Sequence, residues 1–380
     1  MEFTCDKSDL YQGVQSVEKI VGSRSTLPII GNILVEAMKG GVKLSANNLE
    51  IGMEVIIKAR VETEGSVLLP AKTFSGLVAK LPETNVSLKE SEKGTVRISY
   101  KQSSFNINSL KPDEFPLLPK IKDPKVIEID SDVFAEMIKQ TIFAVSMSED
   151  RYVLNGVLME FGKSGLSSDQ SNVRLVSTDG YRLAKRGDKI AGALPEQTSV
   201  IVPAKALLEL LRAIQSQPKG ELKIELGGEQ IAFRYKNYLI VSRLIQGQFP
   251  DYKKVIPKGS ESRVTVDKEA LLESAERAAV IAASSANIVR LEVKGDKMYL
   301  LASAPEVGSV SEVIEADVKG SDKTQIAFNV RLIVDALKVI SSDKVIIELS
   351  GPLSAGIIRP AGGENYTYIV MPIRTAETSA

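Results

Sequence analysis

Three segments of this chain repeat one pattern, and the repetition limits the possible folds more than any other feature. Each repeated segment ends a strand-like run at Pro or Asn and continues as a helix (Val67–Leu81, Val200–Ile214 and Ile326–Ile340). A second landmark recurs in step (Phe115-Pro116, Phe249-Pro250 and Met371-Pro372). The copies lie about 130 residues apart, a period typical of domains rather than of short solenoid repeats. We therefore predict three tandem copies of one domain, each with its own core.

The composition excludes several kinds of enzyme. The 43% apolar and 25% charged residues are those of an ordinary soluble protein. The chain has no histidine, which removes Ser-His-Asp and Cys-His catalysis and His-based metal sites. The single cysteine, Cys5, excludes an internal disulfide and a zinc site of several cysteines. No signal peptide, membrane-spanning stretch or nucleotide-binding glycine motif is apparent, so we expect a cytoplasmic protein without a cofactor or a metal.

Two short motifs have a structural interpretation as well as a catalytic one. Ser341–Lys344 matches SxxK, but the partner motifs of penicillin-type enzymes are missing. Asp130 and Asp132 resemble a metal pair, yet acidic pairs are common in a chain with 48 acidic residues. We expect the first motif to cap or link elements, and the acidic pair to end a strand and cap the following helix, with Asp132 as the cap.

Each copy predicts an α+β domain in which two helices cover antiparallel sheets. The first helices are predicted from Asp6 or Ser8 to about Val21, over 133–144 and over 268–283, and the second helices begin near Ala71, Ala204 and Val330. Alternating apolar segments separated by Gly-rich turns predict the strands. Joints rich in Pro and Lys divide the chain into residues 1–124, 125–259 and 260–380.

Three kinds of function remain open from the sequence: a protein that encloses DNA, a carboxylate-metal hydrolase, and a scaffold that does not bind DNA. The chain carries 48 basic and 48 acidic residues, whereas a typical nucleic-acid binder has a basic excess. Zero net charge argues against tight direct DNA binding, but not against binding by enclosure. A carboxylate-metal nuclease or hydrolase would need a clustered set of acids, which the sequence does not display. A multidomain scaffold that does not bind DNA would share the repeat.

Five motifs, in order and at matching spacing over essentially the whole chain, closely resemble the bacterial sliding clamp family, the β subunit of DNA polymerase III. They are Arg24–Asn32, Tyr152–Gly156, Ser177–Leu183, Gln248–Tyr252 and Val370–Arg374. The resemblance implies a homodimer of two three-domain chains joined head to tail into a ring of six domains, with helices around the hole. Such a ring is a non-enzymatic processivity factor that encircles duplex DNA. It tethers the replicative polymerase, the clamp loader and other partners that carry a clamp-binding peptide.

The resemblance also implies residues that contact DNA. Two loops, around Arg24 and around Arg151, are expected to hold phosphates, and Tyr152 can stack or hydrogen-bond. An alternative interpretation makes the second loop a surface turn with Tyr152 tucked inward. The expected DNA contacts are Arg24, Lys72, Lys80, Ser148, Arg151, Tyr152, Lys205 and Arg212.

A partner-peptide pocket between the second and third domains is the third implication. Its aliphatic residues and Met offer an adaptable apolar socket, and its arginines can fix peptide carbonyls or acids. For single positions such as Val345 or Ile347, an interdomain core is an equally good interpretation. The matching residues are Leu154, Thr178, Gly180, Tyr181, Arg182, Leu183, Pro250, Lys254, Val255, Asn329, Val345, Ile347, Ile369, Val370, Met371, Pro372, Ile373 and Arg374.

The dimer contact is the last implication. The edge strand around Phe105 is expected to pair with an edge of the third domain in the other subunit, because an unpaired edge is an aggregation hazard. Phe105 would then pack near Ile281, although it could instead belong to the core of its own domain. The expected interface residues are Ser104, Phe105, Ile107, Ile281 and Glu306.

Overall fold

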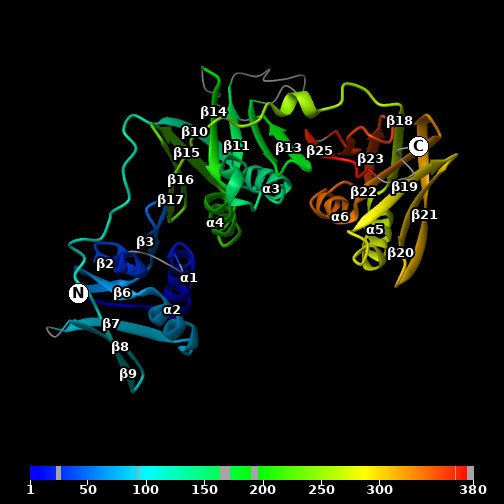
Figure 1. Cartoon of the computed structure of the whole chain (residues 1–380). Helices are drawn as coiled ribbons and strands as arrows, with labels where there is room; N and C mark the ends of the chain where they lie inside the picture. The colour runs from blue at the N-terminus through cyan, green and yellow to red at the C-terminus, as the bar shows by residue number, and fades with distance from the viewer. Residues whose placement is uncertain (23–26, 92–93, 163–171, 190–195, 364, 375–380) are drawn as a thin grey trace. The chain divides into compact units, whose positions relative to one another are not determined.

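The chain folds into three copies of one arrangement of helices and antiparallel sheets (Figure 1). A computed structural model describes residues 1–22, 27–91, 94–162, 172–189, 196–363 and 365–374. Within these residues the first copy contains α1 (Lys7–Glu18), the 3-10 helix η1 (Pro28–Gly31), α2 (Ala71–Lys80) and strands β1 (Glu2–Asp6), β2 (Asn32–Met38), β3 (Gly41–Asn47), β4 (Ile51–Ile57), β5 (Arg60–Thr63), β6 (Gly65–Pro70), β7 (Asn85–Ser91), β8 (Thr95–Tyr100) and β9 (Ser103–Asn108).

The other two copies repeat this order. The second contains α3 (Ser131–Ile142), η2 (Glu149–Asn155), α4 (Ala204–Gln215), η3 (Tyr252–Val255), β10 (Lys125–Asp130), β11 (Gly156–Phe161), β12 (Val173–Thr178), β13 (Arg182–Asp188), β14 (Thr198–Pro203), β15 (Glu221–Gly227), β16 (Gln230–Tyr235) and β17 (Tyr238–Arg243). The third contains α5 (Lys268–Ala282), α6 (Val330–Lys338), β18 (Ser262–Asp267), β19 (Ile288–Lys294), β20 (Lys297–Ala304), β21 (Gly308–Gly320), β22 (Lys323–Asn329), β23 (Lys344–Leu349), β24 (Gly356–Pro360) and β25 (Tyr366–Val370).

Caps fix where the helices begin. The predicted starts of α2, α4 and α6 are confirmed, and the Asn329 side chain accepts a hydrogen bond from the Arg331 amide. The prediction that Asp132 caps α3 is wrong. Asp130 Oδ1 accepts from the amides of residues 132 and 133 at 2.8 and 3.1 Å, because the helix begins at Ser131, two residues earlier than predicted. Asp132 instead forms an ion pair with Lys219.

Three helix ends also differ from the sequence prediction, and α3 ends at Ile142 rather than at residue 144. Helix α1 ends at Glu18 rather than at about Val21, and α5 ends at Ala282. Residues 19–21 form a turn in which the Ile20 and Val21 amides bond the carbonyls three residues back. The i→i+3 pattern tightens the last turn, so the regular helix stops earlier than the apolar spacing predicts.

Strands pair across the joints between copies. β17 of the second copy pairs antiparallel with β4 of the first, with Tyr238 opposite Val55. In the same way β25 of the third copy pairs with β13 of the second, with Tyr366 opposite Arg186. The resulting sheets have the orders β10-β15-β16-β17-β4-β3-β2-β6 and β14-β11-β12-β13-β25-β24-β23-β18-β21-β20-β19-β22, and a third sheet runs β5-β1-β7-β8-β9.

These shared sheets divide the described chain into two compact units rather than three. The first unit is Met1–Phe134 with Lys205–Leu244, and the second is Ala135–Ala204 with Ile245–Ala380. In the first unit α1 packs on α2, β3 and β4, and in the second α5 packs on α6, β20 and β21 (Figure 1). The helices bury one apolar face each, as Leu10, Val14 and Val17 of α1 are fully buried. None of the helices described is long and apolar enough to cross a membrane.

Candidate functional site

The C-terminal segment joins the second and third copies. After β25 the Met371 amide donates to the Tyr181 carbonyl at 2.9 Å, and the Ile373 amide donates to the Ala327 carbonyl at 2.8 Å. Residues 371–374 therefore run from a turn of the second copy to β22 of the third. Two of the predicted pocket residues, Tyr181 and Met371, are thereby brought side by side.

The turn that carries Tyr181 is held by its own side chains. Asp179 Oδ1 accepts from the Tyr181 and Arg182 amides at 2.9 and 3.0 Å, and Thr178 Oγ1 donates to the Arg182 carbonyl at 2.6 Å. Gly180 has a φ of +92°, a conformation in which an L side chain is strained. The sequence Thr-Asp-Gly-Tyr-Arg therefore specifies a tight turn that leaves the Tyr181 side chain 69% exposed.

Beneath the turn lies a cluster of apolar residues contributed by both copies. Its buried members are Leu158, Val176, Leu183, Ile201, Tyr252 and Ile369, and Val153, Ile245, Phe249, Ile256 and Ala355 pack against it. Three large apolar side chains at this place in the fold remain substantially exposed, namely Tyr181 (69%), Val255 (48%) and Met371 (42%). Exposed apolar side chains above an apolar cluster are typical of a surface that a partner covers.

A buried polar network anchors the connecting segment that carries Pro250, Lys254 and Val255. The Tyr252 hydroxyl donates to Glu160 Oε2 at 2.7 Å, and Arg174 Nη1 donates to the same oxygen at 3.1 Å. Burial, with the Glu160 carboxylate, raises the pKa of Tyr252 well above its usual range, so the phenol stays a donor. Lys254 lies at the surface, paired with Asp251 at 3.3 Å.

Arg182 has partners that the sequence did not reveal. Its guanidinium donates to Asp335 of α6 at 2.6 Å, to Asp179 at 3.0 Å and to the Phe143 carbonyl at 2.7 Å. Burial alone would lower the pKa of Arg182, but the hydrogen bond to Asp335 and the nearby Tyr368 and Asp179 outweigh it and raise the pKa. No sequence motif links Arg182 to a residue 153 positions away.

Strand register corrects three of the expected pocket positions. Val345, Ile347 and Val370 are at most 2% exposed and belong to the helix-covered core of the third copy, so they offer no surface to a peptide. Side chains alternate between the faces of a strand, and Ile357 is the residue opposite Ile369. Ile346 and Ile357 therefore share the face of Leu183 and Ile369. Leu154 is 6% exposed, and Asn329 serves as the cap of α6.

The expected DNA contacts are exposed wherever the structure describes them. Lys72 and Lys80 lie on α2, Lys205 and Arg212 on α4, and Ser148, Arg151 and Tyr152 in or beside η2; Arg24 lies outside the described residues. Tyr152 is 58% exposed, so the alternative in which it is tucked inward is wrong. Arg212 is paired with Glu209.

The expected interface residues lie at two sheet edges or on elements next to them. Among the described residues β9 pairs only with β8, and Phe105 at its middle is 39% exposed while Ile107 is 7% exposed. In the described part of the third copy, residues 308–315 of β21 pair only with β20, because β18 pairs with residues 316–320. Glu306 is exposed beside this edge and Ile281 is partly buried on α5.

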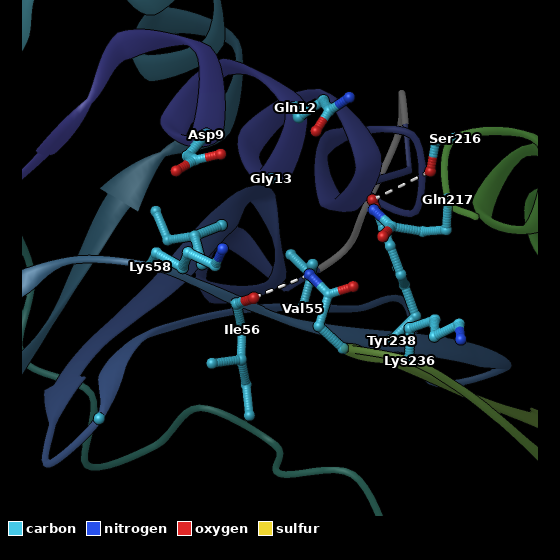
Figure 2. A pocket seen from close by; sticks show the side chains of 13 residues that line it. Asp9, Gln12, Gly13, Val55, Ile56, Lys58, Ser216, Gln217, Lys236 and Tyr238 are labelled. Atoms are coloured by element: carbon cyan, nitrogen blue, oxygen red, sulfur yellow. Dashed lines mark hydrogen bonds between the residues drawn. The ribbon is translucent and has the colours of Figure 1, made fainter.

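A separate polar hollow lies in the first unit, under α1 (Figure 2). It has a volume of about 560 Å³ and lies between α1, the end of β4 and the hairpin that joins β16 to β17. The Tyr238 hydroxyl is within hydrogen-bond distance of Ser16 and Ser216, at 3.3 and 3.4 Å, and Asn237 bonds the Ile56 backbone. Lys58 and Lys236 flank the hollow, while Asp9 and the α4 terminus lie at its edge. Within the described residues no group of three potential metal ligands occurs here or elsewhere.

Comparison with known proteins defines the class. Three family models, described as the N-terminal, central and C-terminal domains of the DNA polymerase III beta subunit, match residues 1–119, 128–251 and 253–374. The Beta sliding clamp of Bacillus subtilis is 32% identical over 99% of this chain and all of the relative, and that of Staphylococcus aureus is equally similar. The crystal structure of the Bacillus subtilis clamp has a TM-score of 0.91, at 32% identity and 99% coverage of both chains. The beta subunit of Thermotoga maritima has a TM-score of 0.90, at 28% identity, over 99% of this chain and all of that one.

The fold is therefore that of a three-domain DNA clamp. The chain belongs to the DNA polymerase III beta subunit family, the bacterial sliding clamps. The family is an accessory processivity subunit without a catalytic site of its own, and its function is that of a DNA sliding clamp. The nuclease and scaffold alternatives are thereby excluded.

Proposed function

We propose that two copies of this chain close head to tail into a ring that encircles duplex DNA and tethers replication and repair proteins. The observation that carries the proposal is the strand pairing that recurs at both junctions between copies. β17 pairs with β4, and β25 pairs with β13. The strand that corresponds to β17 and β25 in the first copy is β9, and the one that corresponds to β4 and β13 in the third copy is the first half of β21. Within the described residues these two edges have no such partner in their own chain, and β9 of one chain could pair with β21 of a second chain in the same way.

The exposure of Phe105 supports this closure. Phe105 lies opposite Ile98 in the hairpin, as Ile240 lies opposite Phe233 and Tyr368 opposite Ile358. Ile240 and Tyr368 are completely buried at the two internal joints, whereas Phe105 is 39% exposed. A β21 edge from a second chain, with Ile281 behind it, would bury Phe105 in the same way.

Enclosure accounts for the zero net charge. A protein that binds DNA through many phosphates loses affinity steeply as salt increases. The slope of log affinity against log salt concentration is about −0.9 for each phosphate contact. A closed ring stays on DNA without such contacts, so a few scattered basic residues are enough for it to contact the phosphates. We assign this role to Lys72, Lys80, Lys205 and Arg212 on the helices, and to Arg24, Ser148, Arg151 and Tyr152 in the loops.

The surface formed by Tyr181, Val255 and Met371 is the proposed docking site for linear peptides of the replicative polymerase, the clamp loader and other partners. Apolar side chains over a shared cluster, rimmed by Arg182, Lys254 and Arg374, suit a short peptide with apolar and polar anchors. We place the domains at residues 1–124, 125–259 and 260–380, and the protein in the cytoplasm at the nucleoid.

A topological experiment tests the proposal. The protein is loaded on nicked circular DNA with a bacterial clamp loader and ATP, and the circle is then cut once. We expect retention on circles in high salt and loss after linearisation. Retention on the linear form would mean that the protein grips DNA directly, and the ring would be wrong.

A further inference from the structure

The ion pair between Arg182 and Asp335 occurs at the joint between the second and third copies, and among the described residues it has no counterpart at the joint between the first and second. The joint between the first and second copies contains the same turn, because Asn48 Oδ1 accepts from the Glu50 and Ile51 amides at 3.1 and 2.8 Å. Strand register places Ile51 where Arg182 stands in the second joint. The turn therefore folds without a guanidinium, and the bonds of Arg182 serve another purpose.

The partner on the helix differs in the same way. Counting from the residue before each helix, Pro203 for α4 and Asn329 for α6, Asp335 corresponds to Glu209. Glu209 bonds Arg212 on its own helix. Asp335 instead reaches out of the third copy to Arg182 at 2.6 Å. The cross-joint pair is thus specific to the joint that carries the proposed peptide site.

Arg182 connects that site to three elements. Its side chain is 12% exposed and also bonds Asp179 and the Phe143 carbonyl, both of the second copy. The Phe143 ring stacks on Tyr368 of β25 at 5.8 Å, and the Tyr368 hydroxyl donates to the Leu332 carbonyl of α6. Among the described partners of the guanidinium, the third copy contributes the Asp335 carboxylate on α6, and the Tyr368 hydroxyl of β25 lies beside the same guanidinium. Asp335 therefore fixes α6 relative to the turn that presents Tyr181 to Met371.

We propose that Asp335 is a positioning residue of the peptide site, which acts through Arg182 to hold the walls from the second and third copies in register. The inference rests on the proposed function of this surface. The guanidinium is committed to two carboxylates and a carbonyl, so its contribution to a peptide is a fixed geometry rather than a free charge. Asp335 does not itself touch the peptide.

The test uses the full-length dimer and a fluorescently labelled peptide Gln-Leu-Ser-Leu-Phe, with affinity measured by anisotropy. We expect Asp335→Asn to weaken binding about tenfold. Asp335→Glu should restore most of the loss. In an Arg182→Gln background the further change Asp335→Asn should have no effect, because the coupling passes through Arg182. Thermal unfolding should not separate the variants, since the Asp335 side chain is 44% exposed.

A matched control lies on the same helix. Lys338 of α6 pairs with Glu276 of α5 at 2.8 Å, within the third copy, and Glu276→Gln should leave peptide affinity unchanged. Equal binding by the wild type and Asp335→Asn would overturn the inference alone. Tighter binding by Asp335→Asn would also overturn it, because Asp335 would then compete with the peptide for Arg182. No binding by the wild type would overturn the proposed docking surface itself.

Discussion

The Tyr252 hydroxyl donates a 2.7 Å hydrogen bond to the buried carboxylate of Glu160, and this bond ties the segment at the end of the second copy to the sheet beneath it. Arg174, 1% exposed, bonds the same oxygen. The chain thus anchors one wall of the proposed peptide site with a fully buried polar network rather than with apolar packing alone.

Removal of that hydroxyl should destabilise the second unit. Tyr252→Phe leaves Glu160 with one donor fewer in a buried place, which costs about 1–3 kcal/mol of the free energy of unfolding. Urea denaturation measures the loss. Tyr299→Phe, at a partly exposed tyrosine of β20, is the control and should change stability by less than about 0.5 kcal/mol. Equal effects of the two changes would contradict the role given to the network.

Charged residues at the proposed dimer edge should produce monomers. Phe105→Asp with Ile281→Asp places two carboxylates in an interface that would otherwise bury apolar side chains, at a cost of several kcal/mol. Sedimentation equilibrium reports the mass. Leu117→Asp, at a residue of the first copy that is 67% exposed, should remain dimeric. A double variant with the dimer mass at the same concentration would remove the support for β9 as the interface.

Loss of the C-terminal apolar contacts should weaken peptide binding. Met371→Ala with Pro372→Ala removes an exposed thioether and the rigid residue that follows it, and we expect affinity for a Gln-Leu-x-Leu-Phe peptide to fall at least about tenfold. Isothermal titration calorimetry measures the change. Met147→Ala alters a methionine that is 93% exposed and lies outside the site, so its affinity should match that of the wild type. Unchanged binding by the double variant would place the peptide elsewhere.

The second loop should contribute one salt-dependent contact to DNA. Arg151→Gln should reduce the slope of log affinity against log salt by about 0.9 if Arg151 neutralises one phosphate. Fluorescence anisotropy with primed DNA at several salt concentrations measures the slope. Lys223→Gln, at a lysine paired with Glu128 at the sheet surface, should leave it unaltered. The same slope for Arg151→Gln and the wild type would exclude the contact.

Cys5 should be unreactive in the native protein. Burial, with Asp9 and Asp6 nearby, raises the pKa of its thiol from 9.0 to about 12, so very little thiolate exists near pH 8. Reaction with a disulfide reagent should be slow until the protein is denatured. Because the folded pKa is the higher one, this group contributes stability below about pH 9 that is lost as pH rises towards 12. Cys5→Ala should flatten that decline, and rapid native labelling would contradict the burial.

Local signals predicted much of the architecture. The repeat indicated three copies, and Pro70, Pro203 and Asn329 marked the starts of the second helices, because these residues stop a strand or cap a helix whatever surrounds them. The turn around Gly180 follows from its own sequence in the same way. The site was predicted only through resemblance. Three of its residues, Val345, Ile347 and Val370, face the core instead, because strand register decides which face of a sheet a residue occupies.

Sequence alone therefore determined the number of copies, the starts of the second helices of each copy, and the likeness to sliding clamps, since these depend on neighbours along the chain. Tertiary structure alone decided that sheets run through the joints, that Val345 and Ile347 face a core while Ile346 faces the other way, and that Asp335 meets Arg182. A shift of one residue moves every side chain to the opposite face of a strand, and a pair 153 residues apart meets only when two copies pack together.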